Sequence, residues 1–386
     1  MNKKLAFVMK PGRNALLLLA AAGFAAGCHK TINPDQKDLR NFEVENLVAN
    51  KAIYHPEAPL DPTLINGFGV AWSPNGIAWV NSVGGHVSEL YHPDGSIART
   101  PVNIPTSAID TTNITAGLPC GIVFSAGKGF TLPNGNKSIF IFTGFDGVLS
   151  AWSGGSNAVF LRQPTGARYT GLAIGNDGNR NLIYGANFKQ KRIDVWDTSF
   201  ARVNMSFSDP SVPAQYSPYN IQAVGDWLFV VYGVLDVTPG SPNQDHGVKG
   251  EGLGYVSVFD MRGKFQKSFA SRGTLNLPWG VTAAPASFLE NKDIDTEGHS
   301  NLKQANYNPK DPVMLIGNFG DGRINVFNQD GKYIGQLAKS NKQPISIDGL
   351  WSLTFAPTGL GLDDKLWFSA GPANESDGIF GYLEKK

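Results

Sequence analysis

Three carboxylates near the end of the chain are the residues best suited to bind a metal ion. Asp348, Glu375 and Asp377 supply hard oxygen ligands, and Asn318 or Asp321 could add a further one. Ca²⁺ is coordinated by several oxygens of this kind. The sequence therefore makes Ca²⁺ a candidate cofactor, although the residues around Glu375 match no calcium-binding motif.

Nucleophilic and soft-metal chemistry find little support. The six histidines form no His-Glu-x-x-His pair, and no Gly-x-Ser-x-Gly motif marks a nucleophilic serine. Cys120 could act as a nucleophile, but a buried, inert thiol is the favoured interpretation. Asp245 and His246 could form an acid–base pair, although an exposed polar loop is favoured. These residues leave catalysis open and favour a protein that is not an enzyme.

A second set of residues could bind a sugar or another flat polar ligand. Aromatic side chains begin several short apolar stretches, and asparagines follow others. Rings offer stacking surface, and amides offer paired donors and acceptors. We therefore expect a ligand-binding rim at the mouth of a channel, formed by Phe68, Tyr219, Trp279, Trp351, Asn187 and Asn318. The alternative is that the rings pack between structural repeats and the asparagines form turns.

A repeated unit must position these residues, and it is clearest between Val313 and Leu337. Two pairs, Asp321-Gly322 and Asp330-Gly331, separate short apolar runs there. Hairpin turns need positive φ angles, which Asp and Gly tolerate, so the segment predicts three antiparallel strands. Similar segments cover residues 77–95, 138–152, 182–197, 227–260 and 365–383.

Another short strand precedes each unit, with a ring or polar residue, a small residue and then aliphatic ones, as in Trp279-Gly280-Val281. Six such units of four strands predict an all-β fold, a six-bladed β-propeller. The alternating segment Phe42 to Val48 is expected to supply the outer strand of the last blade and close the ring. Residues 42–386 are therefore predicted to form a single propeller domain.

Three long connections interrupt the repeat and are candidates for functional loops. They cover residues 98–117, 233–252 and 288–311. Connections alternate between the two faces of an up-and-down blade. The first two connections should therefore share one face, and the third should lie on the opposite face.

The first 41 residues are predicted to lie outside the domain. Four basic residues precede a short apolar run, as in a signal peptide covering residues 1–27. Small residues then lead to Cys28, which resembles the lipidated cysteine of bacterial lipoproteins; an ordinary secretory signal is the alternative. Residues 28–41 would be a polar tether. We expect an exported protein anchored to the membrane of the cell envelope by a lipid on Cys28, and the absence of Asp after Cys28 favours the outer membrane.

The charge balance argues against a nucleic-acid partner. The whole chain has a formal net charge of +1, and removal of residues 1–27, with four positive charges, leaves −3. Neither net charge is typical of a nucleic-acid-binding protein, and the sequence contains no stripe of basic residues. If Cys28 is lipidated, Cys120 has no partner for a disulfide.

Several motifs together resemble a bacterial family of exported propeller proteins. The resemblance covers about Asn46 to Tyr382 and implies the propeller fold and export, but no activity. Some members of that family end in a PEP-CTERM sorting signal, whereas this chain ends Leu383-Glu384-Lys385-Lys386. More distantly, the repeats are similar to NHL-type propellers, which include binding scaffolds, lyases and metal-dependent lactonases. The motifs are residues 66–74, 169–173, 278–281, 317–324, 347–351 and 370–372.

These observations favour a lipid-anchored binding scaffold of the cell envelope, with a carbohydrate or an envelope protein as its ligand. The alternative is a cation-dependent lactonase or lyase acting on carbohydrate-type substrates, with Ca²⁺ near Asp348, Glu375 and Asp377. Carboxylates that converge at the channel mouth would favour the enzyme.

Overall fold

The structure is a computed structural model that describes residues 39–106, 116–241, 244–289 and 313–386. The predicted signal peptide, Cys28 and most of the predicted tether lie outside these residues, as do parts of all three predicted long connections. All described residues belong to one contact unit, Lys37–Lys386.

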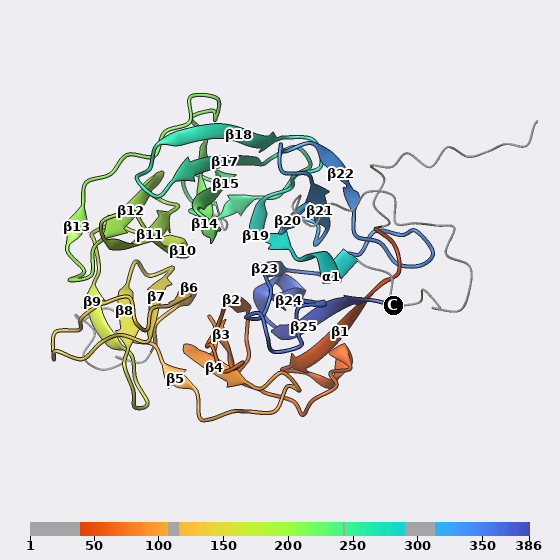
Figure 1. The fold of residues 1–386 in the computed structure, drawn as a ribbon, viewed down its shortest axis with the longest axis horizontal. Coiled ribbons are helices and arrows are strands. Elements are labelled where there is room, and N and C mark those ends of the chain that lie inside the picture. Colours follow the sequence, from red (N-terminus) through yellow and green to blue (C-terminus); the bar gives the residue numbers. More distant parts are fainter. Residues whose placement is uncertain (1–38, 107–115, 242–243, 290–312) are drawn as a thin grey trace, which may run out of the picture. The chain divides into compact units, whose positions relative to one another are not determined.

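Six antiparallel sheets surround a common axis and confirm the six-bladed propeller (Figure 1). The strands nearest the axis begin blades 1 to 6 in turn: β2 (Gly67–Trp72), β6 (Pro119–Phe124), β10 (Tyr169–Asn176), β14 (Tyr216–Val224), β19 (Pro278–Ala284) and β23 (Leu350–Thr354). The second strands are β3 (Ala78–Ser82), β7 (Phe140–Gly144), β11 (Asn181–Asn187), β15 (Trp227–Leu235), β20 (Val313–Asn318) and β24 (Lys365–Ala370). The third are β4 (Val87–Tyr91), β8 (Leu149–Trp152), β12 (Arg192–Trp196), β17 (Tyr255–Asp260), β21 (Ile324–Phe327) and β25 (Ile379–Lys385). The outer strands are β5 (Val102–Asn103), β9 (Val159–Arg162), β13 (Arg202–Val203), β18 (Phe265–Ser271), β22 (Tyr333–Gln336) and β1 (Phe42–Ala49).

The predicted turns and ring closure are both present. Gly322 and Gly331 have φ angles of 70° and 90°, which a residue with a Cβ adopts only with strain. The N-terminal strand β1 pairs with β25 of the last blade, from Phe42 opposite Lys385 to Ala49 opposite Ile379. The first and last parts of the domain therefore share one sheet, which closes the ring without a free edge at the junction.

Each strand nearest the axis carries a shift of register near its start, as a β-bulge produces. In β19 the shift falls between Pro278 and Gly280, and the other five strands have matching shifts. The bulged residue, here Trp279, joins a cluster with residues from all six blades. The next residue is small because the neighbouring strand is close: a Cβ on Gly171 would lie 1.9 Å from Asn220 Oδ1.

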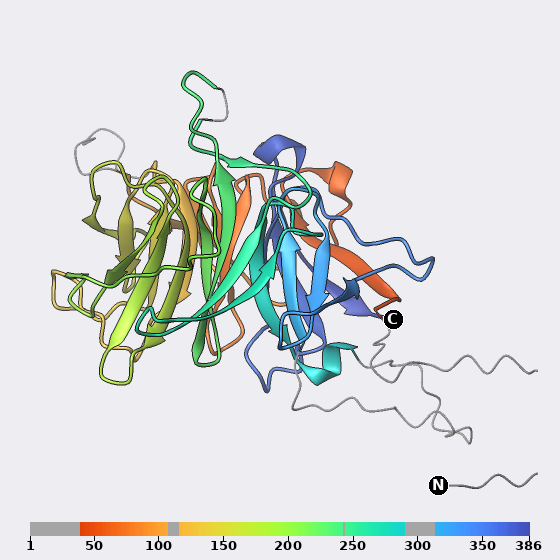
Figure 2. The same cartoon turned by 90° about the horizontal axis from the view of Figure 1, so that it is seen from above.

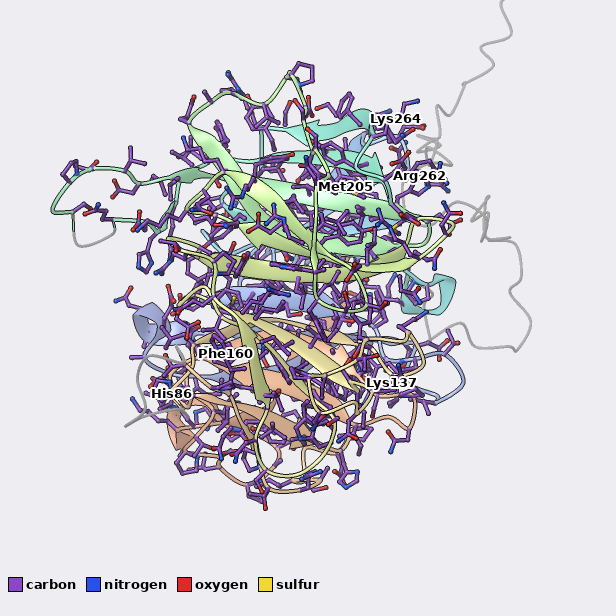
Figure 3. The ribbon with its side chains drawn as sticks, turned by 90° about the vertical axis from the view of Figure 1, so that its left-hand side faces the viewer. His86, Lys137, Phe160, Met205, Arg262 and Lys264 are labelled. Atoms are coloured by element: carbon purple, nitrogen blue, oxygen red, sulfur yellow. The ribbon has the colours of Figure 1, made fainter. Side chains whose placement is uncertain are left out.

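The connections lie on two faces of the propeller (Figure 2). One face, called the insertion face below, carries the turns between second and third strands, including the long connection between β15 and β17. The opposite face carries α1 (Ala286–Leu289), at the start of the third predicted connection. The described parts of these connections thus lie on the predicted faces. Figure 3 shows His86 on the insertion face and Lys137 and Lys264 on the opposite face. Within the described ranges, no helix is long and apolar enough to cross a membrane.

Candidate functional site

An aromatic layer fills the centre of the propeller. Trp351 is stacked between Phe68 and Phe319, with ring centroids 3.8 and 3.7 Å away. Trp279 meets the edge of Phe68 at 5.2 Å, and Tyr219 lies 6.1 Å from Trp351. These five rings, called the aromatic layer below, are each at most 5% exposed. Their contacts are therefore with one another rather than with solvent.

The structure places the six predicted ligand-binding residues inside the protein. The four rings Phe68, Tyr219, Trp279 and Trp351 do come together, but they are buried in the aromatic layer. Asn187 donates hydrogen bonds to Asp194 and Gln190, and Asn318 donates to Asp321 and to the carbonyl of Thr274. Both amides are fully buried. In this structure the rings therefore pack on one another and the amides brace turns, as in the alternative given for them above; ligand binding by these six residues stays a prediction.

The three predicted metal ligands are held by different partners. Asp377 accepts hydrogen bonds from Tyr54 at 2.6 Å and forms an ion pair with Lys51 at 2.6 Å. Burial would raise the pKa of Asp377, but hydrogen bonds from Lys51, Tyr54 and Asn50 hold it below its usual value. Asp348 Oδ2 accepts from the backbone N–H of Ala373 at 3.0 Å. Among the described residues, no group of three His, Cys, Asp or Glu side chains could hold a metal ion, so the geometry does not support the Ca²⁺ site.

Glu375 points toward the aromatic layer because of an unusual turn on the insertion face. The segment Pro372–Glu375 (α2) is not a right-handed helix: Ala373, Asn374 and Glu375 have φ angles of 54°, 54° and 67°. Left-handed residues with a Cβ each cost about 1 kcal/mol or more. The turn is held by Asp348 and by Ser376, whose hydroxyl donates to the carbonyl of Ala373. Strain of this kind is concentrated at functional sites, which directs attention to Glu375.

A hydrogen-bonded chain links Glu375 to the aromatic layer. Asn66 donates from Nδ2 to Glu375 Oε2 at 2.9 Å, and Asn66 Oδ1 accepts from Trp351 Nε1 at 2.8 Å. Burial raises the pKa of Glu375, against the opposing effects of Asn66, Lys249 and Arg168. Burial also raises the pKa of Asp146, which lies in the turn between β7 and β8 on the same face. Both carboxyl groups therefore favour the neutral form more than ordinary surface carboxyls do.

Two cations approach Glu375 from other blades. Arg168 immediately precedes β10, and its guanidinium lies 4.7 Å from the ring of Phe145. Lys249 follows β16 (Gly247–Val248), the short strand that pairs with β15, and its ammonium lies 4.1 Å from the ring of Phe319. The charges of both act on Glu375. We call Arg168, Lys249, Glu375 and Asn66 the mouth site.

The long connection between β15 and β17, called the blade 4 insertion below, is held beside this site by two side-chain contacts. Lys189 pairs with Asp245 at 2.6 Å, and Arg168 Nη2 lies 3.2 Å from His246 Nε2. Because arginine can only donate, the imidazole nitrogen must accept and His246 is neutral in this contact. Loss of water around the ring and the charge of Arg168 both lower the pKa of His246. Asp245 and His246 therefore anchor the loop through Lys189 and Arg168, and this arrangement does not support the acid–base pair considered from the sequence.

Sequence reasoning missed Arg168, Lys249 and Asn66. None belongs to a motif, and only the unusual length of the connection that carries Lys249 marked it as a candidate region. Cys120 is fully buried, its thiol donates to the carbonyl of Tyr169 at 2.8 Å, and burial raises its pKa well above the usual value. A nucleophilic role for Cys120 has no support from this environment.

A separate cavity of about 260 Å³ lies along the axis on the other side of the aromatic layer. It is lined by the later parts of the strands nearest the axis, including Ile122, Leu172 and Ile221, with Trp279 also in its wall. The mouth site and this cavity are thus on different sides of the aromatic layer.

The protein is thus an all-β, six-bladed propeller with a charged mouth on its insertion face. No protein-family model matches the sequence. The uncharacterized protein L690 of Acanthamoeba polyphaga mimivirus is 30% identical over 373 residues, which cover 92% of this chain and 89% of L690. The chain belongs to the same family as L690. The uncharacterized protein R648 of the same virus is 28% identical, with 94% of this chain and 85% of R648 covered.

These relatives are viral, whereas the sequence motifs predicted a bacterial family. The comparisons therefore support neither the bacterial family nor its export and sorting signal. Among solved structures, virginiamycin B lyase from Staphylococcus aureus is similar, with 14% identity, a TM-score of 0.46, and coverage of 89% of this chain and 99% of the lyase. The gluconolactonase XC5397 from Xanthomonas campestris has 12% identity, a TM-score of 0.47, and coverage of 83% and 86%. Similarity at this level concerns the fold alone.

Proposed function

We propose that the protein is a ligand-binding scaffold and that its ligand occupies the mouth site. One observation carries this proposal: the charges of Arg168 from blade 3 and Lys249 from blade 4 both act on Glu375 from blade 6, above the aromatic layer. A strained turn and an inserted strand position two of them. Convergent polar groups are typical of small-molecule sites, where they fix the orientation of the ligand.

The geometry favours binding over the cation-dependent reaction. A lactonase or lyase of the expected kind would need carboxylates around a cation, and Asp348, Glu375 and Asp377 are each engaged separately. The mouth site instead combines two cations, a partly buried carboxyl and an amide. A carbohydrate bearing charged groups suits this combination better than a neutral one.

A lipid anchor on Cys28 remains part of the proposal and rests on the sequence alone. The described chain enters the propeller at the face opposite the mouth site, where the ring of Phe42 lies 5.0 Å from that of Phe288 in α1. A tether leading from this point to a membrane would leave the mouth site facing away from the membrane surface. In that arrangement the mouth site of an envelope protein would be accessible to soluble ligands.

Tryptophan fluorescence can test where a ligand binds. We would screen neutral sugars, uronic acids and sugar phosphates by thermal shift, since a ligand specific for the folded state raises its melting temperature. A stabilising compound should change the fluorescence of the wild-type protein, because Asn66 connects Trp351 to Glu375. The change should fall by at least about half in Trp351→Phe, as expected when one reporter dominates.

Trp227→Phe is the matched control, because Trp227 is 44% exposed and begins β15 on the opposite face. It should keep the full response. A response that is lost in Trp227→Phe and kept in Trp351→Phe would place the ligand away from the mouth site and contradict the proposal.

A further inference from the structure

The mouth site contains positive charge that the described residues do not neutralise. Some other cations on this chain pair with carboxylates: Arg192 and Arg202 with Asp194, Lys51 with Asp377, and Lys189 with Asp245. Within the described residues, neither Arg168 nor Lys249 has an ion pair. They differ from the paired cations although both lie close to Glu375.

Arg168 has an unsatisfied donor. Its Nη2 contacts the neutral ring of His246, its plane lies over Phe145, and its buried Nε has no hydrogen-bond partner among the described residues. A buried donor without a partner is costly, and a guanidinium with only neutral neighbours is rarely kept so without a ligand. An acceptor that contacts the guanidinium of Arg168 would therefore gain binding energy.

Lys249 presents a second donor group with no ion pair or hydrogen bond to the residues that the structure describes. Its ammonium lies against Phe319, which also stacks on Trp351. A cation on the face of an aromatic ring keeps its remaining N–H groups free for a ligand. Arg168 and Lys249 thus offer two donor groups whose charges both act on Glu375.

The nearby carboxyl groups form no ion pair with either cation within the described residues. Glu375 and Asp146 are both partly buried, and burial shifts each toward its neutral form. A neutral Glu375 would itself donate a hydrogen bond to an anion, with its Oε2 already held by Asn66. The site is therefore electrostatically suited to a negatively charged ligand.

We propose that the ligand of the mouth site is an organic anion whose carboxylate or phosphate group binds Arg168 and Lys249. This inference rests on the proposed binding function and specifies its ligand class. Hydrogen bonds between ionised partners are the strongest of the protein hydrogen bonds, so these two cations should supply much of the affinity. Arginine suits either anion, because both accept its paired N–H donors.

Isothermal titration of the full-length protein tests the ligand class with three probes: glucuronate, glucose 6-phosphate and glucose, at one fixed ionic strength. We expect at least one anion to bind and glucose to bind at least about tenfold more weakly. The preferred anion identifies a carboxylate or a phosphate as the recognised group. Raising the salt concentration should weaken binding, since exposed charges are screened.

Variants assign the binding to the two cations. Arg168→Gln and Lys249→Gln should each weaken anion binding by about tenfold or more, whereas Lys264→Gln on the opposite face should bind as the wild type does (Figure 3). Arg168→Lys keeps the charge and should recover part of the affinity lost in Arg168→Gln. Circular dichroism and melting temperature confirm that each variant is folded.

Three results would overturn the inference: equal affinity for glucose and the anions, wild-type anion affinity in both Gln variants, or no binding of either anion at millimolar concentration. A failure of this inference alone can be distinguished from a failure of the binding proposal. A neutral sugar that binds and still perturbs Trp351 would leave the scaffold function standing and remove only the anionic ligand.

Discussion

Replacement of Trp351 by alanine should lower the free energy of unfolding by about 4 kcal/mol. Trp351 is 1% exposed and lies between two stacked rings at the centre of the propeller. Its loss would leave a cavity lined by Phe68, Phe319 and Tyr219 and would remove the donor that satisfies Asn66 Oδ1. Urea denaturation monitored by circular dichroism measures the change.

Two further variants separate packing from hydrogen bonding. Trp351→Phe keeps a ring in the stack and loses the indole donor, so we expect a smaller loss of about 1–2 kcal/mol. Trp227→Ala removes a half-exposed ring and should cost less than about 1 kcal/mol. If Trp351→Ala were as stable as Trp227→Ala, the aromatic layer would not be a principal source of stability.

The stability of the protein should also depend on the protonation of Glu89, a buried side chain in β4. Thr63 Oγ1 lies 2.7 Å from Glu89 Oε1 and 2.6 Å from Asp61 Oδ1. A hydroxyl has one hydrogen and cannot donate to both carboxyl groups. If Thr63 donates to Asp61, which also accepts from Tyr91, Glu89 must carry the proton in the second contact.

The pKa of Glu89 agrees with this arrangement. Burial raises it from 4.5 to about 7, and the charge of Asp61 adds to the rise; only a hydrogen bond donated by Thr63 to Glu89, in place of Asp61, would oppose it. Because the pKa in the folded state is higher than in the unfolded state, the folded state binds the proton more tightly. Stability should therefore fall as the pH rises from about 4.5 through 7, and the cost above pH 7 is at most about 3 kcal/mol.

Glu89→Gln tests this dependence because glutamine imitates the protonated acid. The difference in unfolding free energy between Glu89→Gln and the wild type should be small at pH 5 and should increase by up to about 3 kcal/mol, in favour of the variant, by pH 8.5. Glu43→Gln is the control, since Glu43 is exposed on β1 and the substitution removes the same type of carboxyl group. A pH-independent difference for Glu89→Gln would show that Glu89 is ionised throughout this range.

Local sequence was sufficient to predict the fold because turn chemistry is local. Asp321-Gly322 and Asp330-Gly331 require positive φ angles, and these were found at both glycines. The alternation in Phe42 to Val48 likewise predicted a half-buried strand, and its partner β25 was the only part of the last blade left without an outer neighbour. Repetition in the sequence then specified the number of blades.

Orientation of the candidate site residues depended on features that the sequence pattern does not reveal. The rings at Phe68, Tyr219, Trp279 and Trp351 were recognised as equivalent, but the register shifts that bury them depend on pairing with the next strand. Glu375 and Asp377 are close in sequence, yet the left-handed turn directs one to the mouth site and the other to Lys51. Arg168 and Lys249 meet only through tertiary structure.

A crystal structure of the protein with glucuronate or glucose 6-phosphate, whichever binds more tightly, tests the central claim most directly. We expect the anionic group of the ligand on the insertion face, within hydrogen-bonding distance of the Arg168 guanidinium and Lys249 Nζ, with Glu375 beside it. A ligand found instead in the axial cavity beyond the aromatic layer, or bound without contact to either cation, would contradict the assignment of the mouth as the binding site.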